Sequence, residues 1–454
     1  MMEKKKIHIY LPVEIKTREL IPKVILSKII LENKKKNIRC YIGSKTSILR
    51  LMSLKKTYGG IFIYKGGLTT DRIKKIKKNV EKFIILDEEL GPATEDLKKQ
   101  IRLRMFDGAE KYIDRYYVIG KTVYNLSRKI LPKLKSKIKI TGWPRVDMWR
   151  PESKHMYVDS VKELRKRYGK FILFSSDFGY NSIDRIDAAL KQYKSFQSEW
   201  KLLKKELPNE TVRAKNVFLE YQKFIKLIYE LDKRTDIPQI IIRPHPAEDI
   251  QEWKKVAKSL KRIKVIYKGE VSPWIYASSG VLHRGCTSAA QAYMAGIKIG
   301  YIVSDNKFIR NSLPYKMSKH LCNLKQIVEF CININAKKPI IPKKYTDIFK
   351  DFIHVEAKFA SEIVAEDMLK SDLVSELPCR YSKTQSLLDF LKLIINKLKI
   401  YTRIYLNQHK LEELKPNKMF GGIVKKEIID ILNNYETGHK LKVRQILTNC
   451  IEIE

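Results

Sequence analysis

The sequence lacks the cysteine spacing of a disulfide framework or a zinc site. Its six cysteines are scattered over 454 residues, and none forms a Cys-x-x-Cys pair. No run of about 18 apolar residues is present to span a bilayer. The apolar stretch after the basic run at 4–6 ends at Glu14, which is too short for a signal-peptide core. These absences predict a cytoplasmic protein with free thiols in a reducing compartment.

Acidic residues are scarce relative to basic ones. The chain has 91 Lys and Arg against 50 Asp and Glu, a net charge of +41. The lysines are spread from Lys4 to Lys442, and no RNP-like, zinc-finger or helix-turn-helix motif accompanies them, so we expect no specific nucleic-acid partner. Two interpretations stay open: a solvated compositional excess of lysine, or peripheral attraction to an anionic inner-membrane surface.

Short apolar runs alternate with helical patterns over the first three quarters of the chain. Strands are expected at 7–13, 37–42, 60–64, 83–86, 116–119, 137–141, 171–174, 240–243, 265–267, 280–283 and 298–303, and helices at 17–33, 71–78, 183–233 and 289–295. Such alternation is typical of parallel sheets covered on both faces. The sequence therefore predicts an α/β protein with two Rossmann-like, doubly wound domains.

The expected boundaries divide the chain into three parts. Residues 1–150 form an N-terminal Rossmann-like acceptor domain, residues 151–340 a second Rossmann-like domain for a nucleotide sugar, and residues 341–454 a mainly helical tail. Within the tail, Gln385–Leu406 has an apolar and a basic face. That pattern fits an interfacial membrane helix, or a helix packed on the protein or on a second subunit.

One candidate site is the segment Arg243-Pro244-His245-Pro246 at a predicted strand end. Open parallel sheets bind ligands beyond the carboxyl ends of their strands. The prolines fix the backbone around His245, whose imidazolium can donate to a phosphate or leaving group, and Arg243 adds a fork of donors. The alternative is a rigid turn with a solvent-facing histidine.

A second candidate is the segment His283–Ser288, between a predicted strand and a small-residue helix. Gly285 allows close approach of a ligand, Thr287 and Ser288 offer hydroxyls, and the free N–H groups of a helix start suit a phosphate. The alternative is ordinary N-capping by Thr287 or Ser288. We expect Cys286 to be a buried thiol and no nucleophile.

Two further strand ends carry polar residues. Asp87, Glu88 and Glu89 repel one another, which predicts a raised pKa and a general base among them; a solvated acidic turn is the alternative. Ser175, Ser176 and Gly179 form a polar loop of the kind that contacts nucleotides.

Six segments together resemble the surface carbohydrate biosynthesis protein family, which is similar to the GT-B glycosyltransferases of capsule and lipopolysaccharide assembly. The resemblance covers about residues 5–335. Its segments occur in the family's order: Glu14–Leu20, Asp87–Gly91, Thr141–Asp147, Arg243–Pro246, Gly269–Ile275 and His283–Ser288.

A more distant similarity is to bacterial sialyltransferases and 3-deoxy-octulosonate transferases, which use CMP-activated sugars and carry an acidic motif and a His-Pro motif. Here Leu90 precedes Gly91, so the acidic motif is one residue longer, and which carboxylate is the base stays open. The similarity implies that His245 assists the departing CMP phosphate. Gln291 stands near the place where related enzymes carry a ribose-binding glutamate, so a carboxylate contact is not expected there.

The resemblance implies a glycosyltransferase of surface polysaccharide synthesis. It would transfer a CMP-activated nonulosonate or 3-deoxy-octulosonate to a glycan or lipid-linked acceptor, in a cleft between the two domains, without a metal or further cofactor. The expected catalytic residues are Asp87, Glu88, Glu89 and His245, and the expected residues for the sugar donor are Arg243, Pro246, Ser175, Ser176, Gly179, His283, Gly285, Cys286, Thr287 and Ser288. Alternatives are a nucleotide-sugar 2-epimerase, a CDP-glycerol-type polyol-phosphate transferase and a basic binding module without catalysis.

Overall fold

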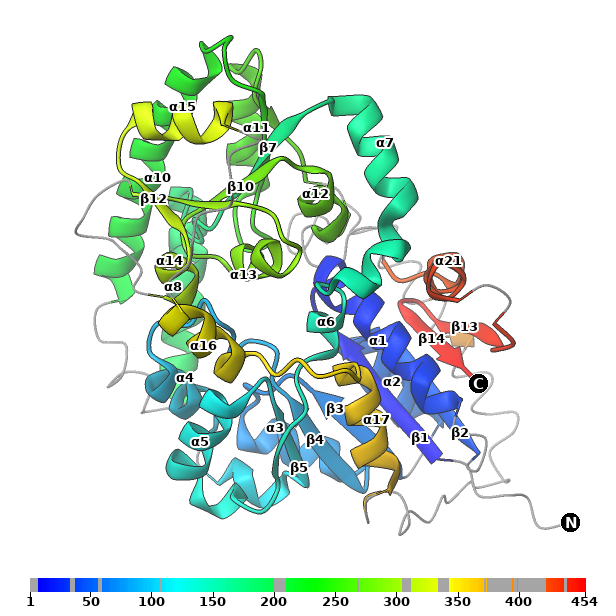
Figure 1. The fold of residues 1–454 in the computed structure, drawn as a ribbon. Coiled ribbons are helices and arrows are strands. Elements are labelled where there is room, and N and C mark those ends of the chain that lie inside the picture. Colours follow the sequence, from blue (N-terminus) through cyan, green and yellow to red (C-terminus); the bar gives the residue numbers. More distant parts are fainter. Residues whose placement is uncertain are drawn as a thin grey trace, which may run out of the picture. The chain divides into compact units, whose positions relative to one another are not determined.

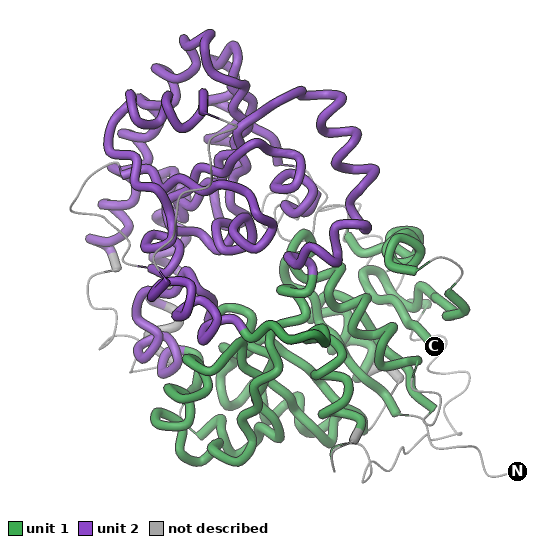
Figure 2. The backbone as a smooth tube through the Cα atoms, viewed as in Figure 1, with its two compact units in different colours: residues 1–89, 104–147, 354–454 green, residues 90–103, 148–353 purple. Residues whose placement is uncertain are grey.

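The apolar runs of the sequence form two separate sheets, one in each of two units of the chain. The computed structural model describes residues 7–32, 37–55, 59–106, 108–199, 210–267, 269–303, 312–333, 343–370, 373, 394–395, 398, 422–436 and 439–454. Figure 2 shows unit 1, which contains residues 1–89, 104–147 and 354–454, and unit 2, which contains residues 90–103 and 148–353.

The sheet of unit 1 has eight strands in the order β13-β14-β2-β1-β3-β4-β5-β6. Its parallel strands are β1 (Ile7–Val13), β2 (Ile38–Ser44), β3 (Ile61–Tyr64), β4 (Lys82–Leu86), β5 (Arg115–Val118) and β6 (Ile138–Ile140). All seven residues of β1 are buried, because both faces of the sheet are covered. The chain adds β2 on one side of β1 and β3 on the other, so the strand order reverses at β1.

Helices and two antiparallel strands complete unit 1. The helices include α1 (Lys16–Leu31), α2 (Lys45–Lys55), α3 (Thr70–Lys77), α5 (Lys121–Ile130), α6 (Pro144–Asp147), α17 (Ala360–Lys370), α21 (Lys425–Tyr435) and the 3₁₀ turns η1 (Ala109–Tyr112) and η2 (Pro132–Leu134). Strands β13 (Val443–Leu447) and β14 (Cys450–Ile453) form a hairpin, and β14 pairs antiparallel with β2. α4 (Leu97–Arg104) crosses the division of the chain between the units.

The sheet of unit 2 has six parallel strands in the order β12-β11-β10-β7-β8-β9. They are β7 (Phe171–Ser175), β8 (Gln239–Arg243), β9 (Lys264–Val265), β10 (Gly280–His283), β11 (Ile299–Ile302) and β12 (Lys319–Leu321). The helices around them are η3 (Pro151–Tyr157), α7 (Val158–Tyr168), α8 (Ile183–Glu199), α10 (Glu210–Asp232), α11 (Ile250–Lys258), α12 (Ser272–Ala277), α13 (Thr287–Met294), α14 (Leu313–Lys316), α15 (Leu324–Ile332) and α16 (Lys343–Phe352). The order reverses between β7 and β10.

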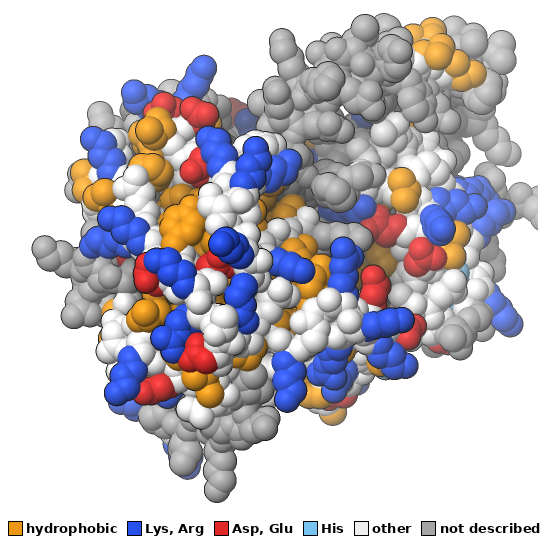
Figure 3. All heavy atoms as spheres, turned by 90° about the horizontal axis from the view of Figure 1, so that it is seen from above, with side chains coloured by type: hydrophobic (Ala, Val, Ile, Leu, Met, Phe, Trp, Pro, Cys, Tyr) orange, Lys and Arg blue, Asp and Glu red, His pale blue; other side chains and the backbone are white. Residues whose placement is uncertain are grey.

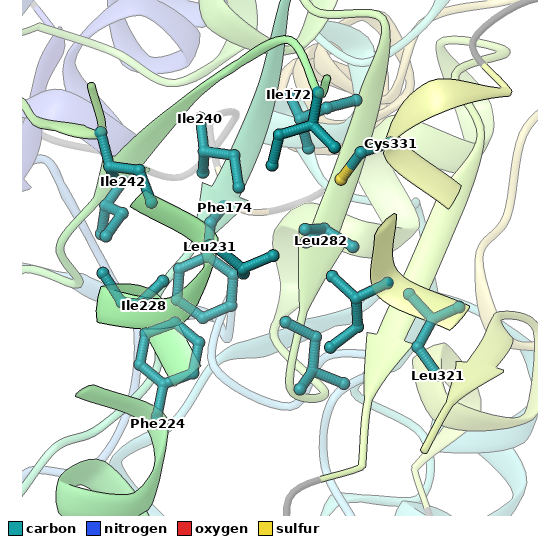
Figure 4. Packing of buried hydrophobic residues seen from close by; sticks show 14 of the residues in the cluster. Ile172, Phe174, Phe224, Ile228, Leu231, Ile240, Ile242, Leu282, Leu321 and Cys331 are labelled. Atoms are coloured by element: carbon teal, nitrogen blue, oxygen red, sulfur yellow. The ribbon is translucent and has the colours of Figure 1, made fainter. Parts of the chain in front are cut away.

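Alternate residues of the unit 2 strands face opposite layers of helices. Ile172 and Phe174 point into a core that includes Phe224 of α10, with further residues from α11 and α15 (Figure 4). Phe171 faces the other way and meets Trp274 of α12, with their rings 6.3 Å apart. Accordingly, α10, α11 and α15 lie on one side of the sheet and α7, α12 and α13 on the other (Figure 1). This two-sided burial is what the continuous apolar strands predict.

Two predictions from the sequence were wrong: that 298–303 is the last strand, and that residues 341–454 form a separate, mainly helical tail. Three strands (β12, β13 and β14) follow 298–303, and residues from 354 onward belong to unit 1. β14 reaches β2 at Gly43, where a Cβ would overlap the carbonyl oxygen of Asn449. The helical region 183–233 contains α8 and α10. The amphipathic segment Gln385–Leu406 lies outside the described residues except for Ile394, Ile395 and Leu398.

A buried carboxylate joins α17, which follows unit 2 in the sequence, to α6 of unit 1. Asp147, at the end of α6, is 2% exposed and accepts hydrogen bonds from Ala360 N at 2.7 Å, Ser361 N at 2.8 Å and Ser361 Oγ at 2.6 Å. These N–H groups belong to the first turn of α17, where an acceptor satisfies donors that the helix cannot pair itself.

Charged side chains are spread over the face that Figure 3 shows, with Asp and Glu lying among the more numerous Lys and Arg. No helix of the described part of the chain combines the length and the apolar character needed to cross a membrane.

We expect Asp147→Ala to lower the free energy of unfolding by about 1–3 kcal/mol, because three buried donors lose their acceptor. Ser361→Ala is the matched control, since it leaves both backbone N–H bonds to Asp147 intact and should cost less. Urea denaturation measures both variants. Equal losses in the two would contradict the capping role of the carboxylate.

Candidate functional site

Three adjacent strand ends form the candidate site of unit 2. In the register of the parallel sheet, His283 of β10 lies beside Ser175 of β7, and Ser175 lies beside Arg243 of β8. The three loops that follow these residues therefore leave the same edge of the sheet. This edge includes the point between β7 and β10 where the strand order reverses, which is where open α/β sheets bind ligands.

His245 has a defined ring orientation. The backbone N–H of Ala247 donates to its Nδ1 atom at 3.1 Å, so the proton of the neutral ring resides on Nε2. The ring is half-buried, and Pro244 and Pro246 restrict the backbone on either side. His245 thus carries a hydrogen-bond donor, Nε2–H, at the end of β8.

Glu248 is a functional candidate that the sequence analysis missed, although it lies three residues after His245. It is 2% exposed. Its carboxylate accepts from Ser176 Oγ at 2.6 and 2.8 Å, from Trp253 Nε1 at 2.6 Å, from His245 N at 3.1 Å, and from Phe178 N. Burial acts to raise the pKa of Glu248, whereas the hydrogen bonds from Ser176, Phe178 and Trp253 favour the ionised carboxylate.

The N-terminus of α13 has no side-chain cap. Cys286 occupies the N-cap position, and Gly285 before it has a φ of +106°, which disfavours other residues. Thr287 is the first helical residue and Ser288 contacts Cys286 Sγ at 2.7 Å, so neither hydroxyl serves as the N-cap. This geometry weighs against ordinary N-capping and in favour of an anion site at the helix start.

Three of the expected residues make their described contacts within the protein. His283 is fully buried, accepts from Gly285 N at 2.9 Å and lies 2.7 Å from Ser318 Oγ; burial lowers its pKa to about 3, so the ring is neutral. Arg243 donates to the carbonyl groups of Ile266 and Gly269 at 3.3 and 2.7 Å. These two residues shape the loops. Burial raises the pKa of Cys286 to about 11, which fits the expected inert thiol.

The remaining expected residues belong to the same loops. Ser175 Oγ is buried and has no hydrogen-bond partner among the described residues. Gly179 follows β7, and a Cβ there would meet nothing within 4 Å. Pro246 is half-buried after His245. Gln291 stands at the position where no carboxylate contact to a ribose was expected, and it donates to Ser272 Oγ at 2.6 Å.

Unit 1 holds a second cluster at the carboxyl edge of its own sheet. Asp87, Glu88 and Glu89 follow β4, Lys65 follows β3, and Glu19 lies in the first turn of α1. β1 and β3 flank the point where the strand order of this sheet reverses. The cluster thus occupies the position in unit 1 that the three loops occupy in unit 2.

The three neighbouring carboxylates have different partners. Asp87 accepts from Arg104 Nε at 2.6 Å. Glu89 pairs with Arg18 and, at 2.9 Å, with Lys65. Glu88 accepts from the backbone N–H of Arg145 at 3.4 Å, which is a long contact.

Burial acts to raise the pKa of all three carboxyl groups, and their different cationic partners separate the resulting pKa values. Asp87 and Glu88 are 3% and 7% exposed, and burial raises the pKa of both, so the solvated acidic turn is wrong. Burial also acts to raise the pKa of Glu89, but Arg18 and Lys65 lower it overall. Glu88 therefore combines a raised pKa with the weakest described partner, which are the properties of a proton acceptor for a substrate hydroxyl.

Within the described ranges, no three His, Cys, Asp or Glu side chains are grouped in a way that could hold a metal ion.

No protein-family model and no curated protein matches the chain. Among solved structures, it is similar to S. aureus MnaA in a co-structure with UDP, with 13% identity and a TM-score of 0.50 over 83% of this chain and 100% of that chain. Matches below that score include Methanocaldococcus jannaschii UDP-GlcNAc 2-epimerase with UDP-GlcNAc and UDP (13%, 0.47, 81% and 100%) and the wall teichoic acid polymerase TagF (11%, 0.48, 80% and 88%). The similarity to MnaA shows the fold and confirms the predicted class, two Rossmann-like parallel-sheet units of the GT-B type.

The unlike surroundings of Glu88 and Glu89 predict opposite effects of the same substitution. A carboxyl group whose pKa is raised by folding makes the folded protein less stable as the pH rises above the group's unfolded pKa of about 4.3. Glu88→Gln, which lacks this group, should therefore become more stable relative to wild type with rising pH. A lowered pKa gives the reverse sign, so Glu89→Gln should cost about 1–3 kcal/mol at neutral pH, and this cost should shrink in acid.

Melting temperatures of wild type and both variants between pH 4 and 8 test this pair, each variant serving as the control for the other. Shifts of the same sign at pH 7.5 would contradict the assignment.

Proposed function

We propose that this protein is a glycosyltransferase of bacterial surface polysaccharide synthesis, with the nucleotide sugar bound at the carboxyl edge of the unit 2 sheet. One observation carries the proposal: three polar loops from adjacent strands meet where the strand order reverses, beside the uncapped N-terminus of α13. Backbone N–H groups at such a position suit the phosphate of a nucleotide.

The chemistry at this edge is displacement at the anomeric carbon of the sugar donor. As the bond from that carbon to the phosphate oxygen breaks, negative charge develops on the departing nucleotide. His245 Nε2–H and the amides that follow Cys286 stabilise this charge, while Thr287 and Ser288 contact the phosphate. Protein donors supply the positive charge, so the proposal includes no metal ion.

The acceptor binds at the carboxyl edge of the unit 1 sheet, where Glu88 removes the proton from its hydroxyl. Arg104 pairs with Asp87, and Arg18 and Lys65 pair with Glu89, so these two side chains are held by cations while Glu88 acts as the base. Among the carboxylates that the extra Leu90 leaves open as the base, the proposal therefore names Glu88.

The identity of the substrates rests on the family resemblance. We propose a CMP-activated nonulosonate or 3-deoxy-octulosonate as the sugar donor and a glycan or lipid-linked acceptor of capsule or lipopolysaccharide. A lipid-linked acceptor would bring the protein to the inner membrane, where anionic lipids attract its basic side chains.

His245→Ala should lower sugar transfer by at least about 10²-fold while leaving the melting temperature close to that of wild type, since the half-exposed ring contributes little to the core. His155→Ala is the control, because His155 is an exposed histidine of η3 whose described hydrogen bond is to the carbonyl oxygen of Glu152. Transfer by the His245 variant at the wild-type rate would remove His245 from the mechanism.

A thermal-shift screen with CMP, CDP, UDP and GDP should give the largest stabilisation with CMP. A ligand at about a hundred times its dissociation constant adds about 2.7 kcal/mol. UDP binding with interconversion of a UDP-sugar in the absence of acceptor would indicate a 2-epimerase, and turnover of CDP-glycerol would indicate polyol-phosphate transfer. Salt-sensitive binding to lipid or polynucleotide, with no stabilisation by any of the nucleotides, would indicate a basic binding module without catalysis.

A further inference from the structure

We propose that Glu248 is the positioning residue of the sugar-donor site in unit 2, holding the His245 imidazole and the loop after β7 at one fixed spacing. The inference rests on the proposed function for its catalytic consequence. Its structural part concerns the orientation of the His245 ring, which can be measured without any substrate.

Glu248 closes the turn that orients His245. The backbone N–H of Glu248 donates to the carbonyl oxygen of His245 at 2.9 Å, and the backbone N–H of His245 donates to Glu248 Oε2 at 3.1 Å. Within the same turn, Ala247 N–H donates to the ring atom Nδ1. The residue that closes the turn therefore also determines which ring nitrogen carries the proton.

The same carboxylate reaches the loop after β7, about 70 positions earlier in the chain. It accepts from Ser176 Oγ and from Phe178 N. On its inner side it accepts from Trp253 Nε1 of α11, which anchors it in the core of unit 2. One carboxylate thus joins the loop after β7, the loop after β8 and a core helix.

A second set of bonds joins the same two loops. Asn181 Nδ2 donates to the carbonyl oxygen of Asp249 at 2.9 Å, Asp249 N donates to Asn181 Oδ1 at 2.7 Å, and Ser182 Oγ donates to Asp249 Oδ2 at 2.8 Å. Hydrogen bonds at two successive residues, 248 and 249, therefore fix the spacing between the loop after β7 and the loop after β8.

Glutamine cannot replace Glu248 without loss. Four groups donate to the carboxylate, and an amide in its place offers one acceptor oxygen and turns an NH₂ group toward the remaining donors. Because the side chain is almost fully buried, water cannot take over the lost contacts.

The test compares full-length Glu248→Gln with Trp253→Phe, a control that removes the core contact of the carboxylate and leaves both loop contacts in place. Nitrogen-15 spectra of histidine-labelled protein report the tautomer of His245, assigned by the signal that His245→Ala removes. Wild type and Trp253→Phe should show the proton on Nε2. Glu248→Gln should show a mixture of tautomers and a loss of kcat on the order of 10²-fold.

The outcomes separate the two proposals. A wild-type tautomer and wild-type kcat in Glu248→Gln overturn the positioning role, whether or not the protein transfers sugar. A changed tautomer in a protein that binds no nucleotide overturns the proposed function and leaves the positioning role standing. If Glu248→Gln does not fold, Ser176→Ala, which loosens the carboxylate from the loop after β7, should shift the His245 signals in the same direction, and unchanged signals overturn the inference.

Discussion

Parallel pairing of the strands is the constraint on which both candidate sites depend. Because neighbouring parallel strands end at the same edge, His283, Ser175 and Arg243 share one row of the unit 2 sheet, although more than 100 positions separate Ser175 from His283 in the sequence. Because the strand order reverses between β7 and β10, the chain leaves these two strands toward opposite sides of the sheet, and the edge between them stays open to a ligand. The sheet of unit 1 has the same property around β1, where the charged cluster is found.

Burial determines the chemistry of the groups gathered at these edges. At the end of β4, three carboxylates in succession differ in proton affinity because Asp87 and Glu88 are enclosed while Glu89 meets Arg18 and Lys65. At the end of β10, enclosure makes His283 neutral and Cys286 a thiol, so two residues with reactive side chains act as structural ones. Residue type alone therefore does not identify the reactive group.

Hydrophobic patterning predicted the strands that are buried on both faces, with β1 and β10 matching the expected bounds. It failed for β12 and β14, which are short strands of three and four residues near or at the sheet edges. The candidate segments at strand ends were predicted because Pro, Gly and polar residues follow apolar runs there. Glu248 and Arg104 were not, because their importance comes from partners such as Ser176 and Asp87 that lie far away in the sequence.

The pairing of β14 with β2 has a consequence for how the chain folds as it is synthesised. The ribosome releases β2 long before β14, so one edge of the first sheet lacks its neighbour until β14 has been synthesised. Unit 2, whose strands come from one continuous stretch, can complete its sheet before then. An open strand edge recruits other chains. A nascent chain of this protein thus exposes the edge of β2 to other chains until β14 has been synthesised and pairs with it.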